Sequence, residues 1–197
     1  MNADETYDLL KSEMSLKNRL VVRLRKININ QKELILDFDR FIDLKELIFI
    51  FDSDKLNINY IEIKNAPEKV CKSTTDYQSN DLTMKIEGKK AKTISWVNGT
   101  LTSIKLDCPN LITVFLRNNK IKEFKYEGKY LKSIDITHNL LKKLEVKSPK
   151  LHTVNAFSNR NIKDLNIKPH VRIMGNYIEL RVDRNLEFTE KTEVYKY

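Results

Sequence analysis

Two consecutive stretches of the chain, LITVFLRNNKIKEFKYEGKY (residues 111–130) and LKSIDITHNLLKKLEVKSPK (residues 131–150), share one pattern of apolar residues. In each block of twenty, apolar or aromatic residues stand at positions 1, 4, 6, 11, 14 and 16, and asparagine stands at position 9. This spacing fits neither a single helix, with a period near 3.6, nor a single strand, with a period of 2. It predicts a repeated unit that contains two short extended segments.

The same pattern continues on both sides of these stretches. The block AKTISWVNGTLTSIKLDCPN (residues 91–110) precedes them, and LHTVNAFSNRNIKDLNIKPH (residues 151–170) follows. One residue is inserted in the last block, so that Ile162, Leu165 and Ile167 take the later apolar positions. A unit of this size cannot bury its apolar face alone, and successive units must therefore stack into a solenoid.

The columns of these blocks read L-x-x-L-x-L-x-x-N-x-L-x-x-L, which resembles the leucine-rich repeat family in a divergent form with short, 20-residue repeats. The resemblance implies a parallel sheet on the concave side and a ladder of inward-pointing asparagines, Asn119, Asn139 and Asn159. An amide suits this role because it carries both donors and an acceptor for backbone groups in a turn. We therefore expect a β-rich α/β solenoid whose convex side is extended or 3-10.

The rest of the chain is less regular. We expect an N-terminal helical cap at residues 1–19, divergent repeats at residues 20–90 with a loop near residues 71–81, regular repeats at residues 91–170, and a C-terminal cap with a polar tail at residues 171–197. Alternating apolar residues predict further strands within KELILDFD (32–39), LKELIFIF (44–51) and INYIEIKNAPE (58–68). Another alternation, at Ile178, Leu180 and Val182, predicts a strand that closes the array.

The composition is basic, with 36 lysines and arginines against 27 aspartates and glutamates and a formal net charge of +9. A positive charge of this size favours anionic partners. A general bias toward lysine along the whole chain explains it equally well. The two cysteines form no CxxC pair, and no secretory signal or membrane-spanning apolar run is apparent. We expect a cytoplasmic protein, with a nuclear location or signal-less export as alternatives.

No catalytic or metal-binding motif is apparent in the sequence. His138, His152 and His170 fall at positions 8, 2 and 20 of their blocks, so they are not expected to converge on one metal ion. No glycine-rich phosphate loop, GxSxG or HExxH pattern occurs. We therefore expect a protein without enzymatic activity, cofactor, metal or small-molecule substrate.

Candidate partner-binding residues are those that the repeat turns outward on the strand side, at positions 5 and 7 of each block. In the regular blocks they are Phe115, Arg117, Asp135, Thr137, Asn155 and Phe157. Aromatic residues beside an arginine are enriched at the centres of protein interfaces. The alternative is that local distortion turns Phe115 or Phe157 into the core.

A second candidate surface is a stripe of lysines after the asparagine turn. Lys122, Lys142 and Lys163 share one column, and Lys125 and Lys143 lie beside it. Such a stripe suits an anionic partner, but a solvated face explains it as well. We expect a protein-interaction scaffold, as a subunit or accessory factor of a larger complex. The alternatives are a protein that docks on RNA or a ribonucleoprotein such as the ribosome, and an exported effector; no membrane partner is expected.

Overall fold

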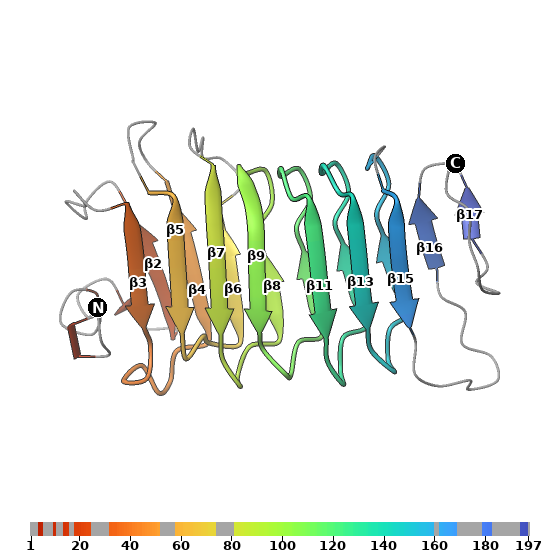
Figure 1. The fold of residues 1–197 in the computed structure, drawn as a ribbon. Coiled ribbons are helices and arrows are strands. Elements are labelled where there is room, and N and C mark those ends of the chain that lie inside the picture. Colours follow the sequence, from red (N-terminus) through yellow and green to blue (C-terminus); the bar gives the residue numbers. More distant parts are fainter. Residues whose placement is uncertain are drawn as a thin grey trace.

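The computed structural model describes residues 4, 5, 10, 14–15, 18–24, 32–51, 58–73, 81–159, 162–168, 179–182 and 194–196. They form a β-solenoid, in which successive coils of the chain stack in parallel along one axis (Figure 1). Each coil contributes one strand to a long sheet and a second strand to an outer layer that runs the opposite way. The β-rich solenoid predicted from the repeat is therefore confirmed.

The long sheet has ten strands and runs the length of the molecule. Its strands, in spatial order, are β1 (Met14–Ser15), β2 (Arg19–Arg23), β4 (Glu46–Ile50), β6 (Lys69–Lys72), β8 (Thr93–Ser95), β10 (Thr113–Phe115), β12 (Ser133–Asp135), β14 (Thr153–Asn155), β16 (Glu179–Val182) and β17 (Val194–Lys196). Only the first pair, β1 with β2, is antiparallel. The central strands are short and rich in Thr, Val and Ile, which favour the pleated conformation.

The opposite layer consists of two smaller parallel sheets. The first contains β3 (Glu33–Asp37), β5 (Tyr60–Lys64), β7 (Leu82–Glu87) and β9 (Leu101–Asp107); the second contains β11 (Glu123–Glu127), β13 (Lys143–Lys147) and β15 (Asp164–Lys168). The ladder is interrupted between β9 and β11. Across this interruption the Tyr126 hydroxyl donates a hydrogen bond of 2.9 Å to the Cys108 carbonyl oxygen, which ties the two coils together.

The strand register reproduces the columns of the repeat. Val114 pairs with Ile134, and Ile134 pairs with Val154, in steps of 20 residues. On the outer layer Leu144 pairs with Leu165, a step of 21 that reflects the single inserted residue. Because the side chains at each position stack on their counterparts, the coils share one continuous core. This core extends from Leu10 to Ile162.

Each regular coil leaves the long sheet through a left-handed residue at position 8. Asn98, Asn118, His138 and Ser158 have φ values of 54°, 55°, 53° and 59°. Asparagine adopts this conformation more readily than most residues. The backbone N–H of Asn118 bonds the carbonyl of Thr137 in the next coil at 3.0 Å, and His138 does the same with Phe157. The left-handed turn thus directs backbone groups toward the neighbouring coil.

Three expectations about the less regular parts differ from the structure. The described residues form strands, with helical conformation only at residues 4, 5 and 10, so the α/β character and the helical cap over residues 1–19 are not shown. Most of the loop expected near residues 71–81 falls outside the described residues, and at its start Cys71 and Lys72 belong to β6. Residues 194–196 of the expected polar tail form β17, which pairs with β16.

Candidate interaction surfaces

The outward face of the long sheet carries two of the predicted anchors in exposed positions. Phe115 is 39% exposed and Phe157 is 37% exposed, so neither ring enters the core. Arg117 is also exposed, whereas Asp135 and Asn155 are half-buried. Phe115, Asp135 and Asn155 lie side by side on β10, β12 and β14. Neighbouring strands are about 4.8 Å apart, so the face from Phe115 to the coil of Phe157 is about 10 Å wide.

Thr137 does not belong to this accessible surface, and its selection as a contact residue is corrected. Its side chain is only 5% exposed. The carboxylate of Asp135 accepts hydrogen bonds from the Thr137 hydroxyl at 2.8 Å and from its backbone N–H at 3.1 Å. The small side chain is therefore held beneath its neighbour at the point where the chain enters the turn. Arg117 and Phe157, at the same position of their coils, are long enough to protrude.

Two residues that were not selected from the sequence are exposed in the turn that follows β12. Leu140 is 47% exposed at position 10 of its coil. His138 is exposed as well, and its ring meets that of Phe157 edge-on, with centroids 6.4 Å apart. The signal for Leu140 was the pair Leu140–Leu141, since the leucine column can accept only one of the two. We call Phe115, Arg117, His138, Leu140 and Phe157 the sheet patch.

The three column asparagines lie beneath this edge and bond the backbone of two coils each. The Asn139 amide nitrogen donates to the carbonyls of Leu116 in the preceding coil, at 2.9 Å, and of Ile136 and Thr137 in its own, at 3.1 Å each. Its oxygen accepts from the N–H of Ile121 at 3.0 Å.

Asn119 and Asn159 make the corresponding bonds one coil away on either side of Asn139. All three amides are buried. They therefore connect adjacent coils and take no part in the accessible surface.

The lysine stripe is partly free and partly paired. Lys122, Lys142 and Lys163 are exposed and stacked, because the N–H of Lys142 bonds the carbonyl of Lys122 at 2.7 Å and that of Lys163 bonds Lys142 at 2.9 Å. Within the described part of the chain, no carboxylate pairs with these three ammonium groups. Lys125 forms an ion pair of 3.4 Å with Glu145, and Lys143 lies opposite Glu123 in the ladder. Only the first three are therefore available to an anionic partner.

Glu145 is the centre of the charge pairing on the second outer sheet. Its carboxylate lies 3.4 Å from the ammonium groups of both Lys125 and Lys147. Burial raises the pKa of Glu145, but the hydrogen bonds from Lys147 and Lys125 outweigh this effect, and the pKa lies below its ordinary value. The hydrogen bond that Lys147 donates to Glu145 likewise raises the pKa of Lys147. This surface thus largely neutralises its own charge.

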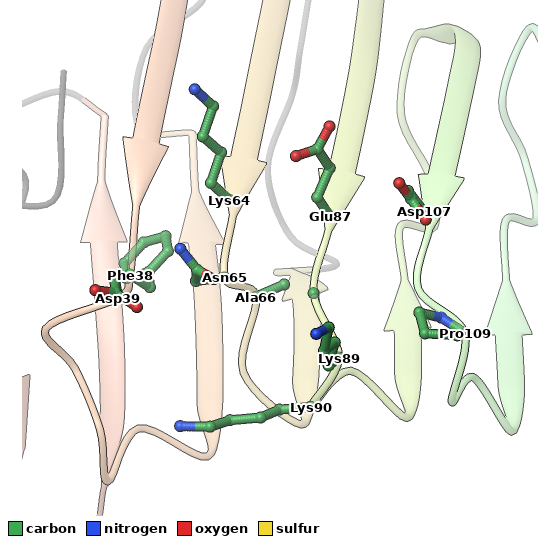
Figure 2. A pocket seen from close by; sticks show the side chains of 11 residues that line it. Phe38, Asp39, Lys64, Asn65, Ala66, Glu87, Lys89, Lys90, Asp107 and Pro109 are labelled. Atoms are coloured by element: carbon green, nitrogen blue, oxygen red, sulfur yellow. The ribbon is translucent and has the colours of Figure 1, made fainter.

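The turns that follow the outer strands line two grooves along one edge of the solenoid. The first groove, shown in Figure 2, holds about 530 Å³ and lies beneath the ends of β3, β5, β7 and β9. Acidic and basic side chains alternate along it, with Asp39, Glu87 and Asp107 among Lys64, Lys89 and Lys90. Two of these groups are engaged: Lys90 donates to the Ile42 carbonyl at 3.0 Å, and Glu87 pairs with Lys85. The first groove therefore has little net charge.

The second groove begins at Pro109, which also lines the first, and continues to Lys150. It holds about 840 Å³ and is bounded by the turns after β9, β11 and β13. Tyr130, 42% exposed, forms part of its wall, and the Lys150 ammonium lies 4.9 Å from the centre of the Tyr130 ring. We call this the turn groove.

The described residues contain neither a metal-binding cluster nor a membrane-spanning helix. No group of three or more His, Cys, Asp or Glu side chains in this part of the chain is placed to hold a metal ion. His138 and His152 lie on different coils, and His170 falls outside the described residues. Nor does any helix among the described residues have the length and apolar character needed to cross a membrane.

Comparisons with known proteins gave no relative. The chain matches no protein-family model, no curated protein and no solved structure. The assignment of a function to this solenoid therefore rests on its own surfaces.

Proposed function

We propose that the protein is a non-catalytic scaffold of the leucine-rich-repeat type, whose sheet patch binds another protein. The observation that carries the proposal is the gathering of Phe115, Leu140 and Phe157, all more than one-third exposed, on consecutive coils beside Arg117. Single apolar side chains at a surface are ordinary, but contiguous apolar patches mark interaction sites. The stacked 20-residue register and the asparagine bonds support the family resemblance. A helical cap at residues 1–19 belongs to the same proposal.

The chemistry of the sheet patch suits a protein rather than a small molecule. Aromatic residues and arginine are enriched at the centres of protein interfaces. The strands beneath hold these side chains at fixed positions, so that little ordering entropy is lost when a partner binds. None of the patch residues lines either of the two grooves, and small-molecule sites are usually concave.

A second candidate function rests on the free part of the lysine stripe. Lys122, Lys142 and Lys163 form a continuous ridge of positive charge, which suits docking on the phosphates of RNA. Such docking would read charge and shape rather than base sequence. Lys125 and Lys147 of the neighbouring outer sheet are paired with carboxylates, so the ridge of free positive charge is only one column wide.

One experiment distinguishes the two functions. Tagged protein is used to recover partners from native extract over a series of salt concentrations, and binding to a 20-nucleotide oligouridylate is measured in parallel. Replacement of Phe115 and Phe157 by alanine should reduce recovery of a salt-tolerant protein partner about tenfold or more. Ile42→Ala, which removes an apolar side chain that is 75% exposed elsewhere, serves as the matched control and should leave recovery unchanged.

The charge reversals Lys122→Glu, Lys142→Glu and Lys163→Glu test the alternative. RNA docking would be lost in this triple variant, and replacing the charges with glutamine should lower the salt slope of RNA binding by about 2, or about 0.7 per phosphate contact. Unchanged partner recovery by the double alanine variant would refute the protein-binding proposal.

A further inference from the structure

The turn groove lies on the edge of the solenoid formed by turns at positions 18–20, away from the turns that carry the left-handed residues at position 8. The turn after β11, which lines the groove, contains Gly128. A Cβ atom at this position would collide with the hydroxyl of Tyr126, whose buried hydrogen bond to the Cys108 carbonyl spans two coils. The glycine therefore maintains that bond.

The walls of the groove are apolar. Pro109 and Pro149 occupy the same position of their turns, and Tyr130 lies on the turn between them. The ammonium of Lys150 makes a cation–π contact with the Tyr130 ring. Proline and tyrosine together provide a rigid apolar surface that loses little entropy when a ligand covers it.

The rim of the groove carries two lysines that form no ion pair among the described residues. Lys129 and Lys150 are exposed, and among the described residues neither forms an ion pair with a carboxylate. Lys147, by contrast, is paired with Glu145 at 3.4 Å and Glu127 at 3.5 Å. A ligand that places carboxylates at Lys129 and Lys150 therefore gains attraction on the open side of the groove.

The remaining carboxylate argues against a nucleic acid. Glu127 lines the same groove, and its side chain is 65% exposed. A polynucleotide carries a negative charge at every residue and would place phosphates near Glu127 as well as near the lysines. A peptide can place its carboxylates at the lysines and an uncharged residue at Glu127.

We propose that the turn groove binds an extended, acidic peptide segment that inserts a proline or aromatic side chain between Pro109, Tyr130 and Pro149. The three turns span about 10 Å, which corresponds to about three extended residues. The volume of about 840 Å³ accommodates the side chains of such a segment. The groove lies apart from the sheet patch, so the scaffold holds two segments at once, from one partner or from two.

The test is a selection of phage-displayed random dodecapeptides on the full chain, with counter-selection on the double variant Tyr130→Ala, Lys150→Glu. Selected peptides should be acidic and should contain proline or an aromatic residue. A synthetic peptide of the selected sequence should bind Tyr130→Ala and Lys150→Gln about tenfold more weakly than the unmodified protein. Tyr130→Phe should retain binding, since the ring and its contact with Lys150 remain.

Lys105→Glu supplies the matched charge-reversal control, because Lys105 is exposed on β9 outside the groove, and binding should stay within about twofold. Thermal unfolding of each variant checks that the coils are intact. Any one of three results overturns the proposal. These are a selection that yields no peptide whose binding depends on Tyr130, selected peptides that lack acidic residues, and a Lys150→Gln variant that binds the peptide as tightly as the unmodified protein. Displacement of the peptide by oligouridylate, with RNA binding that depends on Lys129 and Lys150, would assign the groove to nucleic acid instead.

Discussion

The coils of β8–β15 and the coils of β2–β7 close the same solenoid in different ways. From Thr93 onward the long-sheet strands follow one another in steps of 20 residues, at Thr113, Ser133 and Thr153. Before Thr93 the steps are 27, 23 and 24 residues, from Arg19 to Glu46, Lys69 and Thr93. The extra residues fall mainly between a strand of the long sheet and the next outer strand, on the edge where the regular coils have their asparagine turn.

Where the coils are equal, buried amides satisfy the backbone of that edge. Where the coils are unequal, large side chains fill the interior. The ring of Trp96 packs against those of Phe49 and Phe51, with centroid distances of 5.5 and 5.7 Å. Beside them the buried ammonium of Lys72 donates to the carbonyls of Ser73 and Asn98, at 3.0 and 3.1 Å. A hydrogen-bond ladder needs identical spacing from coil to coil, whereas apolar packing tolerates variation. The boundary between the two solutions lies at Trp96.

The largest loss of stability is expected from a substitution in the irregular coils. Phe49→Ala removes a fully buried ring from the contact with Trp96 and should lower the free energy of unfolding by about 3–5 kcal/mol. Urea denaturation measures the loss. Trp96 is the only tryptophan of the chain, so its fluorescence emission should also shift to longer wavelength. A loss below about 1 kcal/mol would show that the aromatic cluster does not stabilise this half.

A somewhat smaller effect is expected from the regular coils. Asn139→Ala leaves the N–H of Ile121 and the Thr137 carbonyl without their side-chain partner and removes one of two amide donors from the carbonyls of Leu116 and Ile136, and it should cost about 2–4 kcal/mol. Hydrogen exchange at the Ile121 amide should accelerate more than at amides of β3 and β5. Asn155→Ala, on the exposed face of β14, is the control and should cost less than about 1 kcal/mol. Equal losses in the two variants would contradict a structural role for the ladder.

The smallest effect is expected from the charged outer sheet. Because the pKa of Glu145 is lowered in the folded protein, its ion pairs add stability above the unfolded pKa of about 4.3, and that stability is lost as the pH falls through the folded pKa. Glu145→Gln should therefore lower the melting temperature near neutral pH and have less effect near pH 3. Melting curves of both proteins across this range measure the difference. A constant difference at all pH values would mean that the charge pairing is not its source.

Much of the regular half was predictable because the period itself determines which residues stack. The register of the long sheet, the extended outer strands and the effect of the inserted residue near Ile162 all follow from the columns. In the irregular half the strands at Leu34, Phe49 and Ile61 were also expected, since their apolar alternation is strong.

The remaining differences have local physical causes. The side chain of Lys72 points inward from β6. Because a charged residue is not expected at a buried position, the sequence did not predict this strand. Thr137 occupies an outward position but is covered by the carboxylate with which it bonds. The turn groove has no sequence motif. Its two prolines and its tyrosine lie on three different coils and come together only when these coils stack.

The identical steps of the regular coils have an implication for the history of the chain. Excision of residues 111–130 would place Ser133 directly beside Thr93, and the same neighbours would meet at every column. Duplication of that block would lengthen the molecule with equal fidelity. A change by a fraction of a block inside a strand would instead shift buried side chains out of line, whereas the single extra residue near Ile162 is accommodated outside the strands. Whole blocks are thus the units by which the strands of this half can grow or shrink, and each adds or removes a strip of surface for recognition.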